Sequence, residues 1–181
     1  MSREAPVRFC ESVRVRIPCA TRLVILCKTL PQAERALNDA IELLTRMELE
    51  LSPEKTHIRH YNDGFDFLGF SISMRSVRIR QKSEEKFKTK IRDITQRSHN
   101  LEHKVIEKLN QVIRGTVNYF YTNFSTVKSQ FILLDQWIRR RIRMMKYKRM
   151  WHSDNRRLKN KHIERMGLLS CVELGKARLL C

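Results

Sequence analysis

The sequence has little that would suit a secreted, membrane-spanning or zinc-binding protein. Its 181 residues contain no apolar run near the roughly 18 residues of a membrane helix, and residues 1–19 lack the apolar stretch of a secretion signal. The five cysteines stand singly without a C-x-x-C pair, which disfavours zinc and suits a reducing compartment. We therefore expect a protein of the cytoplasm or of an organelle interior, neither secreted nor membrane-bound.

Familiar catalytic motifs are also scarce. No G-x-x-x-x-G-K loop is present to hold phosphates, and no serine has the glycines of a nucleophile elbow around it. His99 and His103 fit the zinc pattern H-x-x-E-H, but no further acidic ligand is indicated, and Ser98 or Asn100 there suits a helix cap. We expect this pattern to be structural, so we predict no metal ligand and no cofactor bound by this chain.

Acidic residues are few relative to basic ones, and the imbalance lies in one part of the chain. There are 37 Lys and Arg residues against 19 Asp and Glu residues, a net charge of +18. Residues 1–70 are neutral overall, whereas residues 71–181 carry the whole excess. Such a surface suits a polyanion, because each phosphate neutralised by Lys or Arg releases condensed counterions. The composition therefore favours nucleic acid as the partner, ahead of a membrane surface.

The densest basic stretch has the pattern of a helix. Between Thr126 and Tyr147, apolar residues recur at helical spacing while arginines surround the remaining circumference. Arginine suits RNA because its planar fork can pair two phosphate oxygens and can stack on a base. A second basic segment, at residues 75–80, alternates with small and apolar residues. The predicted RNA-binding residues are Arg75, Arg78, Arg80, Arg139, Arg140, Arg141, Arg143, Lys146, Lys148 and Arg149.

The first part of the chain has the pattern of strands around one helix. Residues 23–28 form a short β-rich apolar run, and Pro31 then marks the start of an amphipathic helix that should reach about residue 50. Residues 55–61 and 65–73 look like two strands. The sequence Asn62-Asp63-Gly64 between them supplies the positive φ that a tight hairpin needs, so we predict a hairpin there.

The second part has helical periodicity throughout. The spacing predicts a first helix from Ser83, a second over about residues 101–114 that ends at Gly115, and a third over residues 126–147. Three such helices can bury one shared core. The fold class that we expect is α+β: a set of short antiparallel strands with one helix, followed by a three-helix unit.

Six strings of residues, in this order and at these gaps, carry a resemblance to a known family. They are Leu23-Val-Ile-Leu-Cys-Lys-Thr29, Leu51-Ser-Pro-Glu-Lys-Thr56, Phe65-Asp-Phe-Leu-Gly-Phe70, Leu109-Asn-x-x-Ile-Arg-Gly115, Asn118-Tyr-Phe120 and Leu134-Asp-x-Trp-Ile-Arg-Arg140. The set resembles the C-terminal half of the reverse transcriptase/maturase encoded by group II introns. The resemblance implies an atypical segment at 1–22, a partial polymerase palm at 23–73, a helical thumb or maturase domain at 74–150 and a basic tail at 151–181.

The resemblance also implies roles for single residues. Lys55 takes the place of a residue near the nucleotide phosphates, and the primer-grip-like hairpin consists of Phe65, Phe67, Leu68, Gly69 and Phe70. The family has a Tyr-Ala-Asp-Asp turn before the first strand, but this chain has Cys19-Ala20-Thr21-Arg22. Both carboxylates that would hold catalytic Mg²⁺ are missing there. We therefore predict no catalytic residue, and any Mg²⁺ should accompany the RNA.

Three functional hypotheses follow from the resemblance. The first is an RNA-binding maturase fragment that assists folding and splicing of group II intron RNA without polymerase activity. The second is the C-terminal piece of a split or truncated RNA-directed DNA polymerase, active only beside a chain that carries fingers and palm. The third is an eroded gene product, because residues 1–22 join the family-like sequence abruptly at Leu23. Structured RNA is the expected partner in the first two.

Overall fold

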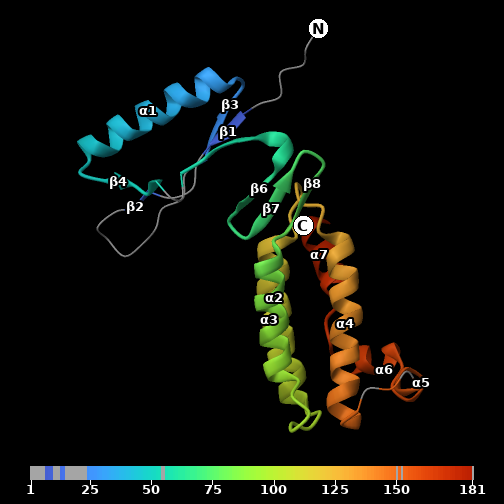
Figure 1. Cartoon of the computed structure of the whole chain (residues 1–181). Coiled ribbons are helices and arrows are strands. Elements are labelled where there is room, and N and C mark those ends of the chain that lie inside the picture. The colour runs from blue at the N-terminus through green and yellow to red at the C-terminus, as the bar shows by residue number, and fades with distance from the viewer. Residues whose placement is uncertain are drawn as a thin grey trace. The chain divides into compact units, whose positions relative to one another are not determined.

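The fold is α+β, as predicted, with short strands and one long helix before residue 80 and helices after it (Figure 1). The structure, a computed structural model, describes residues 7–9, 13–14, 24–53, 56–149, 151 and 153–180. The chain forms two units. The N-terminal unit comprises Met1–Phe65 and Ile72–Arg75, and the helical unit comprises Asp66–Ser71 and Ser76–Cys181. Residues 66–71 thus group with the helices, although the sequence assigned them to the palm.

The N-terminal unit is built on a three-stranded antiparallel sheet in the order β3-β1-β5. Its strands are β1 (Val7–Phe9), β3 (Ile25–Cys27) and β5 (Ile58–His60). A two-stranded pair joins β2 (Val13–Arg14) to β4 (Glu50–Leu51). The central strand therefore comes from residues 1–22, the segment that is atypical of the family that the sequence resembles.

Helix α1 (Leu30–Arg46) has proline in its first turn, as predicted, but it ends about four residues early. The chain leaves the helix through Glu48, which has a φ of 57°. The amide of Glu48 donates to the Thr45 carbonyl, and that of Leu49 donates to the Leu44 carbonyl. These two hydrogen bonds form a Schellman motif. No glycine or asparagine marks the position, so the sequence gives no stop signal there.

The predicted hairpin through residues 62–64 is wrong. Strand β5 pairs with β1, whereas β6 (Phe65–Phe67) belongs to a separate sheet, β6-β7-β8, with β7 (Phe70–Ser73) and β8 (Ser76–Ile79). The segment between β5 and β6 is the 3₁₀ turn η2 (Tyr61–Asp63). The tight turn lies at Leu68 and Gly69, whose φ values of 47° and 82° match a two-residue type I′ turn. Leucine is rare at such a position, so its identity did not suggest the turn.

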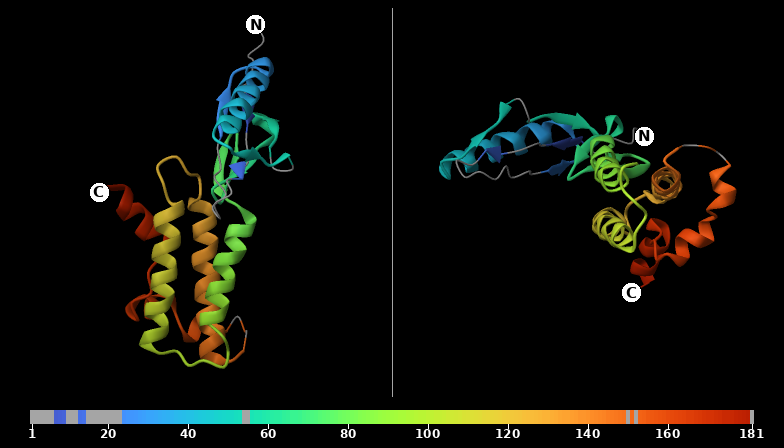
Figure 2. Two further views of the ribbon diagram at one scale, coloured as in Figure 1. Left: turned by 90° about the vertical axis from the view of Figure 1, so that its left-hand side faces the viewer. Right: turned by 90° about the horizontal axis from the view of Figure 1, so that it is seen from below.

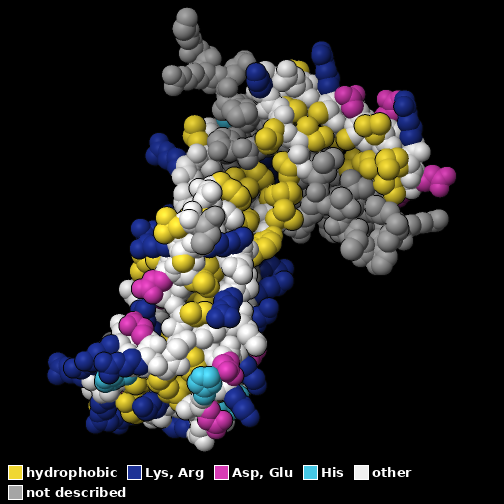
Figure 3. Space-filling model, turned by 180° about the vertical axis from the view of Figure 1, so that it is seen from behind, with side chains coloured by type: hydrophobic (Ala, Val, Ile, Leu, Met, Phe, Trp, Pro, Cys, Tyr) yellow, Lys and Arg dark blue, Asp and Glu magenta, His cyan; other side chains and the backbone are white. Residues whose placement is uncertain are grey.

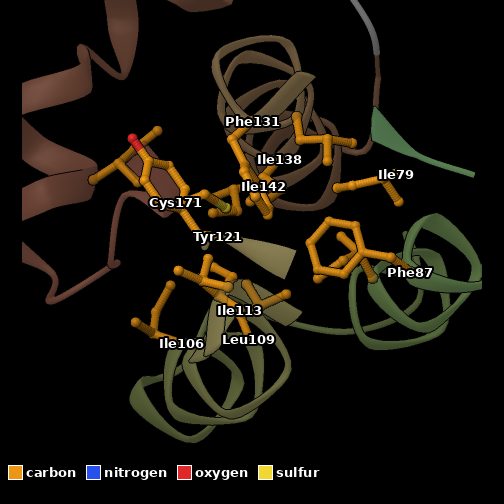
Figure 4. Close-up of a cluster of buried hydrophobic side chains, with 14 of the residues drawn as sticks. Ile79, Phe87, Ile106, Leu109, Ile113, Tyr121, Phe131, Ile138, Ile142 and Cys171 are labelled. Carbon is orange, nitrogen blue, oxygen red and sulfur yellow. The ribbon is translucent and has the colours of Figure 1, made fainter. Parts of the chain in front are cut away.

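Three long helices follow one another up and down in the helical unit (Figures 1 and 2). They are α2 (Gln81–Ile94), α3 (His103–Phe120) and α4 (Lys128–Tyr147). Helix α3 continues through Gly115, so the predicted end there is wrong. Figure 4 shows their facing side chains, with Phe87, Leu109, Ile113, Ile138 and Ile142 directed into one core. This shared core confirms the predicted three-helix packing.

The segment after residue 150, which the sequence predicted to be a basic tail, instead contains three more helices. They are α5 (Asp154–Arg157), α6 (Asn160–Arg165) and α7 (Cys171–Leu180). Leu158, Ile163 and Cys171 from this region are buried in the same core as the long helices. The side chain of Asn110 on α3 fixes the connection between α6 and α7, because it donates to the Gly167 carbonyl and accepts from the Leu169 amide. None of the helices in the described part of the chain combines the length and apolarity of a membrane span.

Candidate nucleic-acid interface

The arginines of α4 point to two different sides of the helix. Gln136, Arg139, Arg140 and Arg143 form one stripe, because residues three, four and seven positions apart share a helix face. This stripe faces the segment with α5 and α6, which lies along one side of α4 (Figure 2). Arg141 points away from the stripe, toward the end of α2. The sequence placed all four arginines together on one exposed surface, and the structure divides them.

A groove opens between α4 and the α5–α6 segment. Its volume is about 520 Å³, and we call it the cationic groove. Its lining residues are Gln136, Arg139, Arg140, Arg143, Asn155, Lys159, Asn160 and Lys161. The lining thus has five basic residues and three amides, with no acidic residue among the described ones. Positive side chains donate to phosphate oxygens and amides can bond to sugars or bases, so this chemistry suits a nucleic-acid strand.

Arg143 forms the inner wall of the cationic groove and is buried. Its Nε donates to the Leu158 carbonyl at 2.9 Å, and its Nη2 donates to Asn160 Oδ1 at 2.6 Å. Burial lowers the pKa of the Arg143 guanidinium, and the nearby charge of Arg139 lowers it further. An arginine nevertheless stays charged at physiological pH. Arg143 therefore ties the α5–α6 connection to α4 and lends the groove its charge.

Arg139 and Arg140 both lie at the rim of the cationic groove, but they differ in exposure and in their contacts within the protein. Arg139 lies 3.8 Å from the Glu164 carboxylate and has a side chain that is 20% exposed. Arg140 is exposed, and so are Lys159 and Lys161 across the groove. The three exposed cations are the best placed to meet phosphates, because they can bind without first giving up a contact within the protein.

Arg141 has a structural position at the C-terminal end of α2. Its Nε donates to Thr95 Oγ1 at 3.0 Å, and its Nη2 donates to the Thr95 carbonyl at 2.9 Å. Burial, followed by the charges of Arg92 and Arg97, lowers the pKa of the Arg141 guanidinium. A cation there also complements the negative end of the helix dipole. Arg141 is therefore committed to holding α2 against α4.

The predicted basic residues at the end of α4 are also divided. Lys146 is exposed and lies near the Tyr147 ring, whereas Lys148 donates to the backbone carbonyl of His99. Arg149 pairs with the buried carboxylate of Asp154, with Nη2 at 3.4 Å from Oδ1. Figure 3 shows Lys and Arg side chains gathered at the end of the helical unit where α4 finishes. A basic surface thus exists here, although some of its members also hold the fold together.

The second predicted basic segment is only partly available. Arg78 on β8 is exposed, and its neighbour Ile79 is buried, as expected of a half-buried strand. Arg80 makes an ion pair with Asp66, with Nε at 2.8 Å from Oδ2. Arg75 is exposed in the turn before β8 and belongs to the N-terminal unit. Arg78 is the free cation of this strand among its described residues.

The primer-grip-like hairpin lies against the end of α3. The ring of Phe70 packs against Phe120 at a centroid distance of 5.0 Å, and the hydroxyl of Tyr119 donates to the Leu68 carbonyl at 2.8 Å. Leu68 is half exposed at the tip of the turn. A Cβ on Gly69 would lie 3.3 Å from the Phe120 ring, so the close approach needs glycine. The hairpin is therefore held to the helical unit with its tip accessible.

The other predicted site residues in the N-terminal half of the chain are Phe65, Phe67 and Lys55. Phe67 is half buried on β6, and Phe65 belongs to the N-terminal unit. Lys55 lies outside the described residues, and so do Cys19-Ala20-Thr21-Arg22. The predicted loss of catalytic carboxylates and the proximity of Lys55 to a nucleotide therefore stay predictions.

The H-x-x-E-H pattern is not on one helix. His99 lies in the loop before α3, with Nδ1 3.2 Å from the Ile94 carbonyl, and α3 begins at His103. Nδ1 of His103 lies 3.3 Å from the Glu107 carboxylate on the same helix. Within the described ranges, no group of three or more His, Cys, Asp or Glu side chains could hold a metal ion.

Sequence reasoning missed the far side of the cationic groove, which consists of Asn155, Lys159, Asn160 and Lys161. These residues were assigned to a tail because the segment is short of apolar residues. The signal that could have indicated this side of the groove was the pair of apolar residues Leu158 and Ile163. They lie five residues apart, on either side of the start of α6, so their spacing gave no clear period. The two buried side chains fold the segment back onto α4 and so create the groove.

Comparison with known proteins identifies the helical unit. Residues 84–166 match the family described as the maturase-specific domain of group II introns. This match confirms the resemblance for the maturase domain, whereas the palm-like assignment of residues 23–73 stays a prediction. The match also reaches past residue 150, and so includes the α5–α6 segment that completes the cationic groove. No curated protein matches the chain.

Proposed function

We propose, from the premise that residues 84–166 are a group II intron maturase-specific domain, that this chain binds structured intron RNA and assists its folding and splicing. The intron RNA supplies the catalysis and the Mg²⁺, and the chain has no polymerase activity of its own. The cationic groove is the principal RNA contact in this proposal, and Arg78 and Lys146 are peripheral contacts.

The observation that carries the proposal is the cationic groove itself. Five basic side chains converge from α4 and from the α5–α6 segment, and Arg140, Lys159 and Lys161 among them are exposed. Like charges repel one another, so such a cluster costs stability unless an anion neutralises it. An RNA backbone provides regularly spaced phosphates for this purpose, with counterion release as the driving force.

The test is the salt dependence of RNA binding by the full chain. Engaging about six phosphates should give a log–log slope of about −4 to −5 against salt concentration. The variant Arg140→Gln, Lys159→Gln, Lys161→Gln should weaken binding and reduce the slope by about 2 to 3, because three phosphate contacts are lost. The measurement is fluorescence anisotropy with a labelled group II intron fragment.

A matched control separates the cationic groove from net charge. Lys104, Lys108 and Arg114 are exposed on α3 and outside the groove. Changing these three to Gln removes the same charge and should leave most of the affinity and slope intact. Equal losses in the two triple variants would contradict the assignment of the groove, and salt-independent binding would contradict phosphate recognition altogether.

Splicing assistance is tested separately from binding. A group II intron RNA should splice faster with the chain present at Mg²⁺ concentrations where the RNA alone folds poorly. The groove variant should lose this stimulation in proportion to its loss of affinity. Stimulation without any stable binding would contradict the proposal that the chain acts by stabilising folded RNA.

A second candidate function is favoured by the N-terminal unit. Three of its apolar side chains, Leu26, Leu43 and Met47, are more than half exposed. Exposed apolar side chains of this size suit a surface that a partner covers. This observation favours a split polymerase, in which a separate chain with fingers and palm supplies the catalytic aspartates.

The second candidate function predicts primer extension only when this chain is mixed with a fingers–palm polypeptide. The chain alone with Mg²⁺, template and primer should give no product, and a separately expressed fingers–palm polypeptide should give product only after the chain is added. Changing Leu26 and Met47 to Ser should abolish the stimulation. Extension by the chain alone would contradict both candidate functions.

A further inference from the structure

Trp151 is exposed next to the cationic groove. Its side chain is 67% exposed, although tryptophan carries one of the largest apolar surfaces of any residue. It borders a smaller hollow of about 160 Å³, which is lined by Arg140, Arg143, Met144, Arg149, Trp151, Asp154 and Asn155. Arg140, Arg143 and Asn155 line the cationic groove too, so the hollow continues it. An exposed aromatic ring and a row of basic side chains thus share one site.

Arg149 holds the indole of Trp151 from one side. The guanidinium carbon lies 5.6 Å from the centre of the ring, which is the distance of a cation–π contact. The same guanidinium is paired with the Asp154 carboxylate, which is almost completely buried. Asp154 therefore anchors Arg149, and Arg149 steadies the ring. A ring that is held on one face and open to solvent elsewhere can accept a flat partner with little loss of conformational freedom.

We propose that Trp151 is a stacking platform for an unpaired base of the bound RNA, whose flanking phosphates lie in the cationic groove. The inference rests on the proposed RNA-binding function and adds the kind of RNA that this site selects. A paired base presents only its edges, whereas an unpaired base can turn out and lay its face on an aromatic ring. The site should therefore prefer RNA with a bulge or loop over a continuous duplex.

The experiment compares two RNA hairpins that differ only by one bulged nucleotide. The full chain should bind the bulged hairpin about tenfold or more tightly, because stacking one base on an aromatic side chain is worth that much. Trp151→Ala and Trp151→Leu should lose this preference while keeping salt-dependent binding to the continuous hairpin. Trp151→Phe should keep most of the preference, because it retains an aromatic face. Leucine keeps apolar area without that face, so the pair distinguishes stacking from simple burial.

Fluorescence gives an independent reading, because the chain has two tryptophans. Trp137 is partly buried in the helical core, so Trp137→Phe is a mild change that leaves Trp151 as the single fluorophore. The bulged hairpin should quench this emission strongly and the continuous hairpin weakly. Circular dichroism and urea unfolding of every variant verify that the helical unit is intact.

The outcomes separate the two proposals. If Trp151→Ala keeps the full preference for the bulge, or loses affinity equally for both hairpins, the stacking site is refuted and RNA binding stands. An unquenched Trp151 also refutes it. If the wild-type chain binds neither hairpin, the proposed function fails and the inference fails with it.

Discussion

Asp135, in the middle of α4, caps the first turn of α7. Its Oδ1 accepts the backbone N–H of Cys171 at 2.9 Å, and its Oδ2 accepts the Ser170 hydroxyl at 2.7 Å. The carboxylate is almost fully buried between the two helices. A negative charge at a helix N-terminus binds free backbone N–H groups and complements the helix dipole. One residue of α4 thus fixes the place where the last helix begins.

Changing Asp135 to Ala should destabilise the helical unit by about 2–3 kcal/mol. The loss is large because the change removes charge-assisted hydrogen bonds and leaves the buried amide of Cys171 without an acceptor. Urea unfolding followed by circular dichroism measures it. Asp93→Ala is the control, because Asp93 is exposed on α2, and it should change stability by less than about 0.5 kcal/mol. Equal stability of the two variants would contradict a capping role for Asp135.

The helices and their inward faces could be predicted from the sequence, but their polar connections could not. Phe131, Leu134, Ile142 and Met145 are buried as the periodicity predicted, because a 3.6-residue repeat depends on local spacing alone. The contact between Asp135 and Cys171 joins residues 36 positions apart, and no local pattern indicates such a pair. Asn110 and Asp135 stand in two of the strings that resemble the intron-encoded maturases, and the structure gives both a packing role.

Arg140 and Arg141 are neighbours in sequence with opposite expected roles. Arg141→Gln should lower stability by about 1–2 kcal/mol, because it removes charged hydrogen bonds to Thr95 at the end of α2. It should leave the RNA affinity of the folded chain nearly unchanged. Arg140→Gln should keep stability and weaken RNA binding with a smaller salt slope. Unfolding and RNA titration of both variants make the comparison, and the reverse assignment of the two effects would contradict the division of α4.

The candidate site was only half predictable, for a physical reason. Net charge and the arginine-rich stretch indicated a basic surface on the third long helix, and basic residues of α4 do line a groove, because charge is a property of composition. Which cations are free depends on partners far along the chain: Arg143 donates to Leu158, and Lys148 donates to His99. The far side of the cationic groove forms only because Ile163 is buried against the long helices. Such long-range packing leaves no periodic signal in a short segment.

Alkaline pH should destabilise the helical unit through Cys171. Burial raises the pKa of this thiol, and the charge of Asp135 adds to the effect. Below the unfolded-state pKa of about 8.5, the thiol is protonated in both states and its contribution is complete. Above it, only the unfolded state loses the proton, so stability falls by up to about 1.4 kcal/mol per pH unit from this group.

The variant Cys171→Ala tests this pH dependence. It should be less stable than the wild type at neutral pH, because a buried side chain is shortened. Between about pH 8.5 and 10 its stability should fall less steeply than that of the wild type, since the other titrating groups are common to both chains. Urea unfolding across this range gives the two slopes. Parallel slopes would show that the thiol also ionises in the folded state.

Two helical glycines should respond oppositely to alanine. A Cβ on Gly175 of α7 would overlap the ring of Tyr121, which is itself buried and stacked on Phe131. A Cβ on Gly115 of α3 would meet nothing within 4 Å. Gly175→Ala must therefore push α7 away from the core and should cost about 1–3 kcal/mol or more. Gly115→Ala should instead stabilise by about 0.5–1 kcal/mol, because alanine has less backbone freedom to lose on forming a helix.

Thermal and urea unfolding of the two single variants measure these opposite changes in stability. A Gly175→Ala protein as stable as the wild type would mean that α7 does not pack on Tyr121 in solution.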